Sequence, residues 1–341
     1  MDAWMSDPIR RKGWTNVMKK ILSLLLCLAM LLTLGLTAMG QAEDGGELRV
    51  SLCIAETLGD LGFYDSANEG LKRLEADYGV IGSVVECKSD ASMYQVALVE
   101  AAEQSDVVVA VGWQFWDSLP GVIEAFPDKQ FLFIDNAIDG SFENGMSILY
   151  AQNEGSFLVG YIAAKLTKTG KIGVVGGEDS ATINDFIVGY EAGAAYANPD
   201  ITVEKQYANG FEDPANGKEC ALALYGMGCD IVFQVAGKTG EGVFEAAAET
   251  GNYAIGVDGD QKYINPDVII CSMVKKVGKS IYDTVADMEN YFKGGEIWEA
   301  DMATGYIDVV YGDDTMPQQV SDELKAEVEA LKEKIISGEI E

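Results

Sequence analysis

The chain has 341 residues, 48% of them hydrophobic, and a formal net charge of −31, so it is long and apolar enough to build a large core. This charge repels phosphate backbones and anionic lipid surfaces, which argues against nucleic acid or a membrane surface as the ligand. The sequence contains no histidine, which excludes Ser-His-Asp and Cys-His nucleophiles, His-ligated zinc and an imidazole general base.

The first predicted element is a secretory leader. Lys19 and Lys20 precede the apolar run 21–36, and small residues stand at alternate positions in 37–42. This order predicts a signal peptide within residues 1–42, with an extension at 1–17, and the run is short for a membrane span. We therefore expect export to the periplasm or to the outer face of the plasma membrane. No lipoprotein cysteine follows the run, so the sequence leaves the presence of a lipid anchor open.

Short apolar runs alternate with amphipathic segments from residue 47 onward. Strands are predicted at 48–55, 83–87, 107–111, 131–134 and 147–150, then at 171–175, 202–206, 231–235, 253–257 and 268–272. Helices are predicted between most of them, for example at 66–78, 114–125, 185–196, 217–225 and 240–250. Continuous apolar strands separated by helices indicate parallel sheets that are covered on both faces.

These strands are too numerous for one ordinary sheet, and their pattern restarts near Lys171. We therefore predict an α/β protein with two doubly wound parallel-sheet lobes joined by a multi-strand hinge, and expect a monomer. Lobe one is assigned to residues 43–152 plus 276–300, and lobe two with a closing tail to 153–275 plus 301–341. The hinge is expected near 152–155, with the chain returning to lobe one near 272–279, and further helices at 277–292 and 321–336.

Ligands of such sheets bind beyond the carboxyl ends of the strands. Loops at these ends carry the candidate residues Phe63, Tyr64, Asp65, Trp113, Asp135 and Asp258. An aromatic face can stack on a base, and a carboxylate can accept hydrogen bonds from hydroxyl or N–H groups. The same residue types also staple or cap helices and form turns. Residue type alone leaves both interpretations open.

Two further segments carry polar groups without a recognisable phosphate motif. The Gly-rich segment 236–242 opens a helix, but it lacks the GxxxxGK[ST] spacing, and 173–177 lacks GxGxxG. Lys275, on the return segment, could donate to a ligand oxygen or be a solvated surface lysine. We predict neither a cofactor nor a metal site.

Several longer stretches resemble the basic-membrane-protein family of substrate-binding proteins, which includes the purine nucleoside receptor lipoproteins. They are GFYDSANEG at 62–70, FPDKQFLFID at 126–135, AQNEGSFLVGYIAAKL at 151–166, FEDPANGKECALALYGMGCDIVFQVAGKTGEGV at 211–243, AIGVDGDQ at 254–261 and CSMVKK at 271–276. The resemblance implies a type I periplasmic-binding-protein fold, a nucleoside held between the lobes, an ABC permease as partner and no catalytic residue.

The resemblance also assigns roles to individual residues. By this similarity Phe63 and Phe211 would sandwich the base, and Asp135 would read it. The ribose would be held by Gly237, Asp258 and Lys275. Tyr64 and Asp65 stand where relatives often have an Asn-Asp pair, so the preferred base stays open.

We therefore expect the substrate-binding component of an ABC importer, with a nucleoside ligand and a preference for purines. A surface sensor, or another small-ligand receptor with this fold, would have the same cleft, so the sequence does not separate these functions. A carboxylate-based nucleoside hydrolase is a further alternative, although the dense N-terminal Asp cluster expected of such an enzyme is absent.

Overall fold

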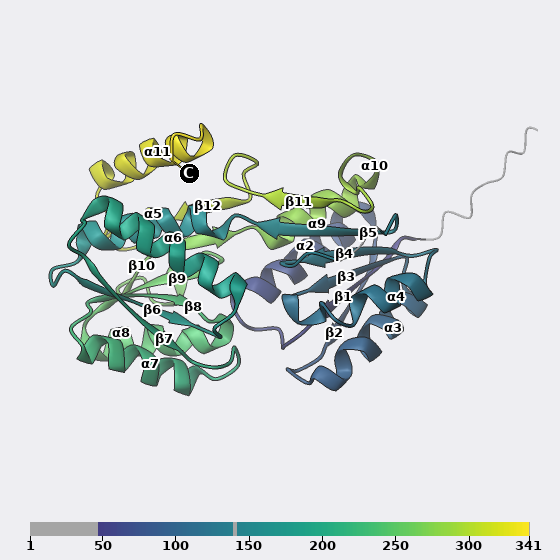
Figure 1. Cartoon of the computed structure of the whole chain (residues 1–341), viewed down its shortest axis with the longest axis horizontal. Coiled ribbons are helices and arrows are strands. Elements are labelled where there is room, and N and C mark those ends of the chain that lie inside the picture. The colour runs from purple at the N-terminus through teal and green to yellow at the C-terminus, as the bar shows by residue number, and fades with distance from the viewer. Residues whose placement is uncertain (1–46, 139–141, 341) are drawn as a thin grey trace, which may run out of the picture. The chain divides into compact units, whose positions relative to one another are not determined.

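Two six-stranded sheets form the framework of residues 47–138 and 142–340, the part of the chain that the computed structural model describes (Figure 1). The predicted signal peptide lies outside these residues. The two sheets with their helices confirm the predicted two-lobe α/β fold, and all ten predicted strands are present. No described helix is both long enough and apolar enough to span a bilayer.

The first sheet has the strand order β11-β5-β4-β3-β1-β2 and is parallel throughout. Its strands are β1 (Arg49–Ile54), β2 (Ile81–Glu86), β3 (Val107–Val111), β4 (Gln130–Ile134), β5 (Gly145–Tyr150) and β11 (Ile297–Ala300). Its helices are α2 (Phe63–Tyr78), α3 (Tyr94–Gln104), α4 (Leu119–Ala125), α9 (Val277–Ala286) and α10 (Met288–Tyr291), with 3-10 turns η1 (Ala91–Met93) and η2 (Trp113–Phe115). Every residue of β3 is buried, as expected for a central parallel strand.

The second sheet has the order β12-β10-β9-β8-β6-β7, in which only β12 is antiparallel to its neighbour. Its strands are β6 (Lys171–Gly176), β7 (Thr202–Tyr207), β8 (Ile231–Val235), β9 (Tyr253–Asp258), β10 (Ile269–Lys275) and β12 (Ile307–Val310). Its helices are α5 (Gln152–Leu166), α6 (Ala181–Ala197), α7 (Pro214–Gly226), α8 (Glu241–Thr250) and α11 (Asp322–Ile336), with η3 (Gly237–Gly240) and η4 (Lys262–Ile264). Figure 1 shows α5 and α6 over one face of this sheet and α7 and α8 over the other.

The chain passes between the two sheets three times within the described residues. It crosses from β5 to α5, returns from β10 to α9, and crosses again from β11 to β12. The segment 152–155, predicted as part of the hinge, is the first turn of α5. The helix predicted at 277–292 is divided into α9 and α10 at Asp287, whose backbone is not helical.

Candidate functional site

The carboxyl ends of the parallel strands of both sheets border one cavity with an empty volume of about 600 Å³. This is within the range of small-molecule sites. Eight of the nine predicted ligand-binding residues line it, namely Phe63, Tyr64, Trp113, Asp135, Phe211, Gly237, Asp258 and Lys275. Residues far apart in sequence therefore converge on one space.

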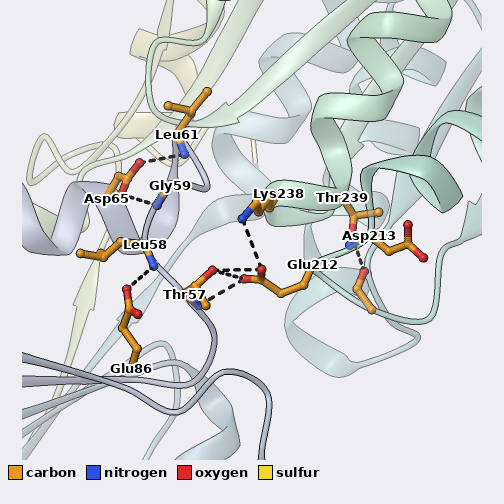
Figure 2. A network of polar contacts seen from close by, with 11 residues as sticks. Thr57, Leu58, Gly59, Leu61, Asp65, Glu86, Glu212, Asp213, Lys238 and Thr239 are labelled. Atoms are coloured by element: carbon orange, nitrogen blue, oxygen red, sulfur yellow. Dashed lines mark hydrogen bonds and ion pairs between the residues drawn. The ribbon is translucent and has the colours of Figure 1, made fainter.

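Asp65 is the predicted residue that does not line this cavity. Its carboxylate accepts hydrogen bonds from the backbone N–H groups of Gly59, at 2.9 Å, and Leu61, at 3.0 Å (Figure 2). Both oxygen atoms are thus used to shape the loop that precedes α2. Of the two interpretations that the residue type allowed, the geometry favours the structural one.

Asp60 fixes the start of α2, where Phe63 and Tyr64 stand. Its carboxylate accepts from the backbone N–H groups of Gly62, Tyr64 and Asp65 at 2.9–3.1 Å, as a capping residue does. Burial raises the pKa of Asp60 to about 7. The two aromatic rings that follow meet edge to face, with their centroids 5.0 Å apart.

A buried ion pair stands at the centre of the cavity wall. The Lys275 Nζ atom donates to Asp135 Oδ1 at 2.9 Å, and the side chains are 2% and 9% exposed. The ammonium group also lies 4.8 Å from the centroid of the Phe63 ring and 5.0 Å from that of Phe186. Cation–π contacts of this kind are strongest where water is excluded. Asp135 directly follows β4 of the first sheet and Lys275 ends β10 of the second, so the pair links the two lobes.

Asp258 contributes a second buried carboxylate to this centre. Its Oδ1 atom is buried and has no hydrogen-bond partner among the described residues. Burial raises the pKa of Asp258 to about 7, nearby Lys275 opposes this rise, and Asp135 adds to it. Asp135, the residue after β4, and Asp258, the last residue of β9, both have positive φ, 72° and 65°. Such backbone strain is typical of functional positions, and an unpaired buried acceptor suits a ligand that brings a donor.

The Phe211 ring lines the cavity and packs directly against Gly177. A Cβ atom at Gly177 would lie 2.1 Å from the Phe211 ring, closer than any real contact allows. Gly237 begins η3 nearby, and its missing Cβ would lie 3.5 Å from the same phenylalanine. The 3.5 Å distance is an ordinary van der Waals contact, so the position of the Phe211 ring requires the missing side chain of Gly177 but not that of Gly237.

Polar contacts join the two lobes through Glu212 and Lys238, which both line the cavity (Figure 2). Glu212 accepts hydrogen bonds from the Thr57 hydroxyl group at 3.0 Å and from its backbone N–H at 3.2 Å, and forms an ion pair with Lys238 at 3.6 Å. Close by, Gln261 Nε2 donates to the backbone oxygen of Leu61 at 3.1 Å. These contacts hold the loop after β1 against the second lobe.

Several cavity residues were not predicted, among them Gln114, Phe186, Glu212 and Lys238. Glu212 and Lys238 lie in loops at the carboxyl ends of parallel strands, where ligands are expected to bind. Their position in the sequence could therefore have identified them as candidate ligand contacts. Gln114 also lies in such a loop, at 112–116, but it was placed at the start of a predicted helix and not named as a ligand contact. Phe186 was placed inside a second predicted helix. Among the described residues, no cluster of three or more Asp, Glu or Cys side chains could hold a metal ion.

Comparisons with known proteins agree with the resemblance seen in the sequence. A family model described as "ABC transporter substrate-binding protein PnrA-like" matches residues 47–341. The chain is 35% identical to basic membrane protein A of Borreliella burgdorferi over 330 residues, which covers 95% of each protein. It is 36% identical to basic membrane protein D of the same species over 260 residues, covering 74% of this chain and 75% of the relative.

Solved structures give the same result for the fold. An ABC transporter solute-binding protein from Aeropyrum pernix K1 superposes with a TM-score of 0.78 at 27% identity, covering 86% of this chain and 92% of that one. A second such protein, from Conexibacter woesei, has a TM-score of 0.70 at 23% identity, covering 86% and 98%.

Proposed function

Because the chain belongs to the PnrA-like family of ABC transporter substrate-binding proteins, we propose that it captures a nucleoside, with a preference for purines, and delivers it to an ABC permease. The observation that carries this proposal is the shared cavity, in which Phe63 and Phe211 from the two lobes accompany Asp135, Asp258 and Lys275. Aromatic rings offer stacking surfaces to a base. The carboxylates and the ammonium group offer partners to hydroxyl and N–H groups.

The polar groups suit the two halves of a nucleoside. Asp258 has an unpartnered buried oxygen, which supports a hydrogen bond from a sugar hydroxyl. Asp135 Oδ1 accepts from Lys275, while Oδ2 accepts no hydrogen bond from the described residues and can accept one from a base N–H. Closing two lobes on such a ligand excludes water and strengthens these bonds. A micromolar dissociation constant requires about 8 kcal/mol, which two stacking faces and a few hydrogen bonds can supply.

The proposal also assigns the residues of the chain to the two lobes. We assign residues 43–152 with 276–300 to one closing lobe and 153–275 with 301–341 to the other. Sheet membership supports this division, because β11 ends at Ala300 and β12 begins at Ile307. We further propose that residues 1–42 direct export, that the protein works as a monomer outside the cytoplasm, and that it catalyses no reaction.

Isothermal titration with adenosine, guanosine, inosine, uridine and free ribose tests the proposed ligand. The purified protein is first unfolded and refolded to remove any co-purified ligand. We expect at least one purine nucleoside to bind with a micromolar or lower dissociation constant, and ribose to bind much more weakly. If none of the nucleosides produces heat or raises the melting temperature, the proposal is wrong. Release of free base from inosine would instead indicate an enzyme.

The variants Phe63→Ala and Phe211→Ala should each weaken nucleoside binding by about 1–3 kcal/mol, because each removes one stacking face. The melting temperature of the ligand-free protein should change little, since both rings are only partly buried. Titration of each variant measures the loss. Trp116→Ala is the matched control, because Trp116 is 57% exposed and does not line the cavity. A variant that binds normally but unfolds early would assign its ring to the core.

A further inference from the structure

Gln114 lines the cavity, and only the nitrogen atom of its side-chain amide is hydrogen-bonded within the described residues. The Nε2 atom donates to Glu56 Oε1 at 2.9 Å. The Oε1 atom is buried and, within the described part of the chain, accepts no hydrogen bond. Buried polar atoms are almost always paired in folded proteins. An orphaned carbonyl oxygen on a cavity-lining residue therefore points to a partner that arrives with the ligand.

Glu56 fixes which end of the amide is engaged. It is 4% exposed and stands two residues after the end of β1. Its Oε2 atom is hydrogen-bonded to the hydroxyl group of Tyr64, and its Oε1 atom faces Gln114. Burial raises the pKa of Glu56 to about 8, and the charges of Glu212, Glu178 and Asp60 add to the rise. A proton on Glu56 can sit on the Tyr64 side, so Oε1 can accept from the Gln114 amide in either state.

Gly112 provides the space for this arrangement. It follows β3 with a φ of 107°, a conformation that favours glycine. A Cβ atom here would lie 2.6 Å from Gln114 Oε1 and 3.1 Å from the Tyr64 hydroxyl oxygen. Three neighbouring positions of lobe one thus cooperate in holding one amide in one orientation.

We propose that Gln114 is a specificity-determining residue, whose side-chain carbonyl oxygen accepts a hydrogen bond from an N–H group on the base of the bound nucleoside. This inference rests on the proposed function. A base with an N–H group at this edge satisfies the buried oxygen. A base that presents only a ring nitrogen lone pair there leaves two acceptors facing each other, so it is rejected. The favoured ligands are bases with an amide N–H or an exocyclic amino group.

The test compares inosine, adenosine and purine riboside, whose six-membered ring has no N–H group, by isothermal titration. The wild-type protein should bind the tighter of inosine and adenosine at least tenfold better than purine riboside. In Gln114→Met, which keeps the length but loses both polar atoms, this ratio should fall severalfold, and any selection that remains is assigned to Asp135. The decrease should come from the ligand with the N–H group. Trp116→Ala, two residues away and outside the cavity, should keep the wild-type ratio.

Binding measurements distinguish a wrong ligand class from a wrong role for Gln114. If the wild-type protein binds no nucleoside, the proposed function is wrong and this inference falls with it. If nucleosides bind but the wild-type ratio is already one, Gln114 does not select the base; this measurement needs no variant. An unchanged ratio of ten or more in a folded Gln114→Met also overturns the inference, because the selection then comes from another residue.

Discussion

Lys275→Met is expected to lower the free energy of unfolding of the ligand-free protein by about 3–5 kcal/mol, the usual cost of removing one partner from a buried ion pair. The variant leaves Asp135 without its counter-ion and Asp258 without the one positive charge that opposes its raised pKa. Two buried carboxylates then share a site with no ammonium group. Urea unfolding at pH 7 measures this loss of stability, because the unfolding midpoint and the dependence of the unfolding free energy on urea concentration together give the free energy in water. Nucleoside affinity should fall in the same variant.

The matched variant is Asp135→Asn. It should lower the free energy of unfolding clearly less than Lys275→Met does. It leaves Lys275 with Asp258 as an alternative counter-ion, so the charge on the ammonium group stays compensated. The double variant Asp135→Asn/Lys275→Met should recover part of the stability that Lys275→Met loses, because the uncompensated charge at position 135 is gone. Equal costs for the two single variants, or strictly additive costs in the double variant, would contradict a coupled charge centre.

The second large effect concerns pH. The pKa values of Glu56, Asp60 and Asp258 are raised to about 8, 7 and 7 from ordinary values of 4.5, 3.8 and 3.8. Between pH 4.5 and pH 7 the folded protein therefore binds more protons than the unfolded chain. Stability must fall as pH rises through this window, by up to about 1.4 kcal/mol per pH unit for each group. The decrease should level off above pH 8.

Urea unfolding at half-unit steps from pH 5 to pH 8.5 gives the slope directly. The variant Glu56→Gln/Asp258→Asn should show a smaller slope, because two of the three groups can no longer titrate. The high net negative charge acts in the same direction in both proteins, so the difference between the slopes isolates the buried carboxyl groups. A wild-type stability that rises from pH 5 to pH 8 would show that these side chains are ionised in the folded protein.

The sequence predicts most of the ten longer strands well because they are apolar runs whose residues are buried; β2 and β7 are the exceptions, with partly buried and exposed residues only. In β3, for example, five apolar residues in a row are all buried, and the same run is visible in the sequence. The helix α5 was not predicted, since it is buried on nearly every side and lacks the polar stripe that marks an amphipathic helix. The edge strands β11 and β12 have four residues each, too few for a pattern. Their positions depend on the sheets that they join.

The candidate site was predictable where topology alone places a residue. Asp135 follows one parallel strand and Asp258 ends another, so the expectation that ligands bind at the carboxyl ends of strands identified both. The contact between Thr57 and Glu212 joins positions 155 residues apart, and no local pattern carries that information. Asp65 shows the opposite case, in which residue type suggested a ligand contact and the local backbone used both oxygen atoms.

Strand β11, at one edge of the first sheet, is synthesised after most of the chain. Ser147 of β5 pairs with Ile297 of β11, and nearly all of the second sheet lies between them in the sequence. A ribosome must therefore finish most of both lobes before the first lobe can complete its sheet, and closing so long a loop slows folding. A nascent chain that folds late stays unfolded for longer, and an unfolded chain can pass through a narrow translocation channel. The discontinuous order of strands thus suits the export that we propose for this chain.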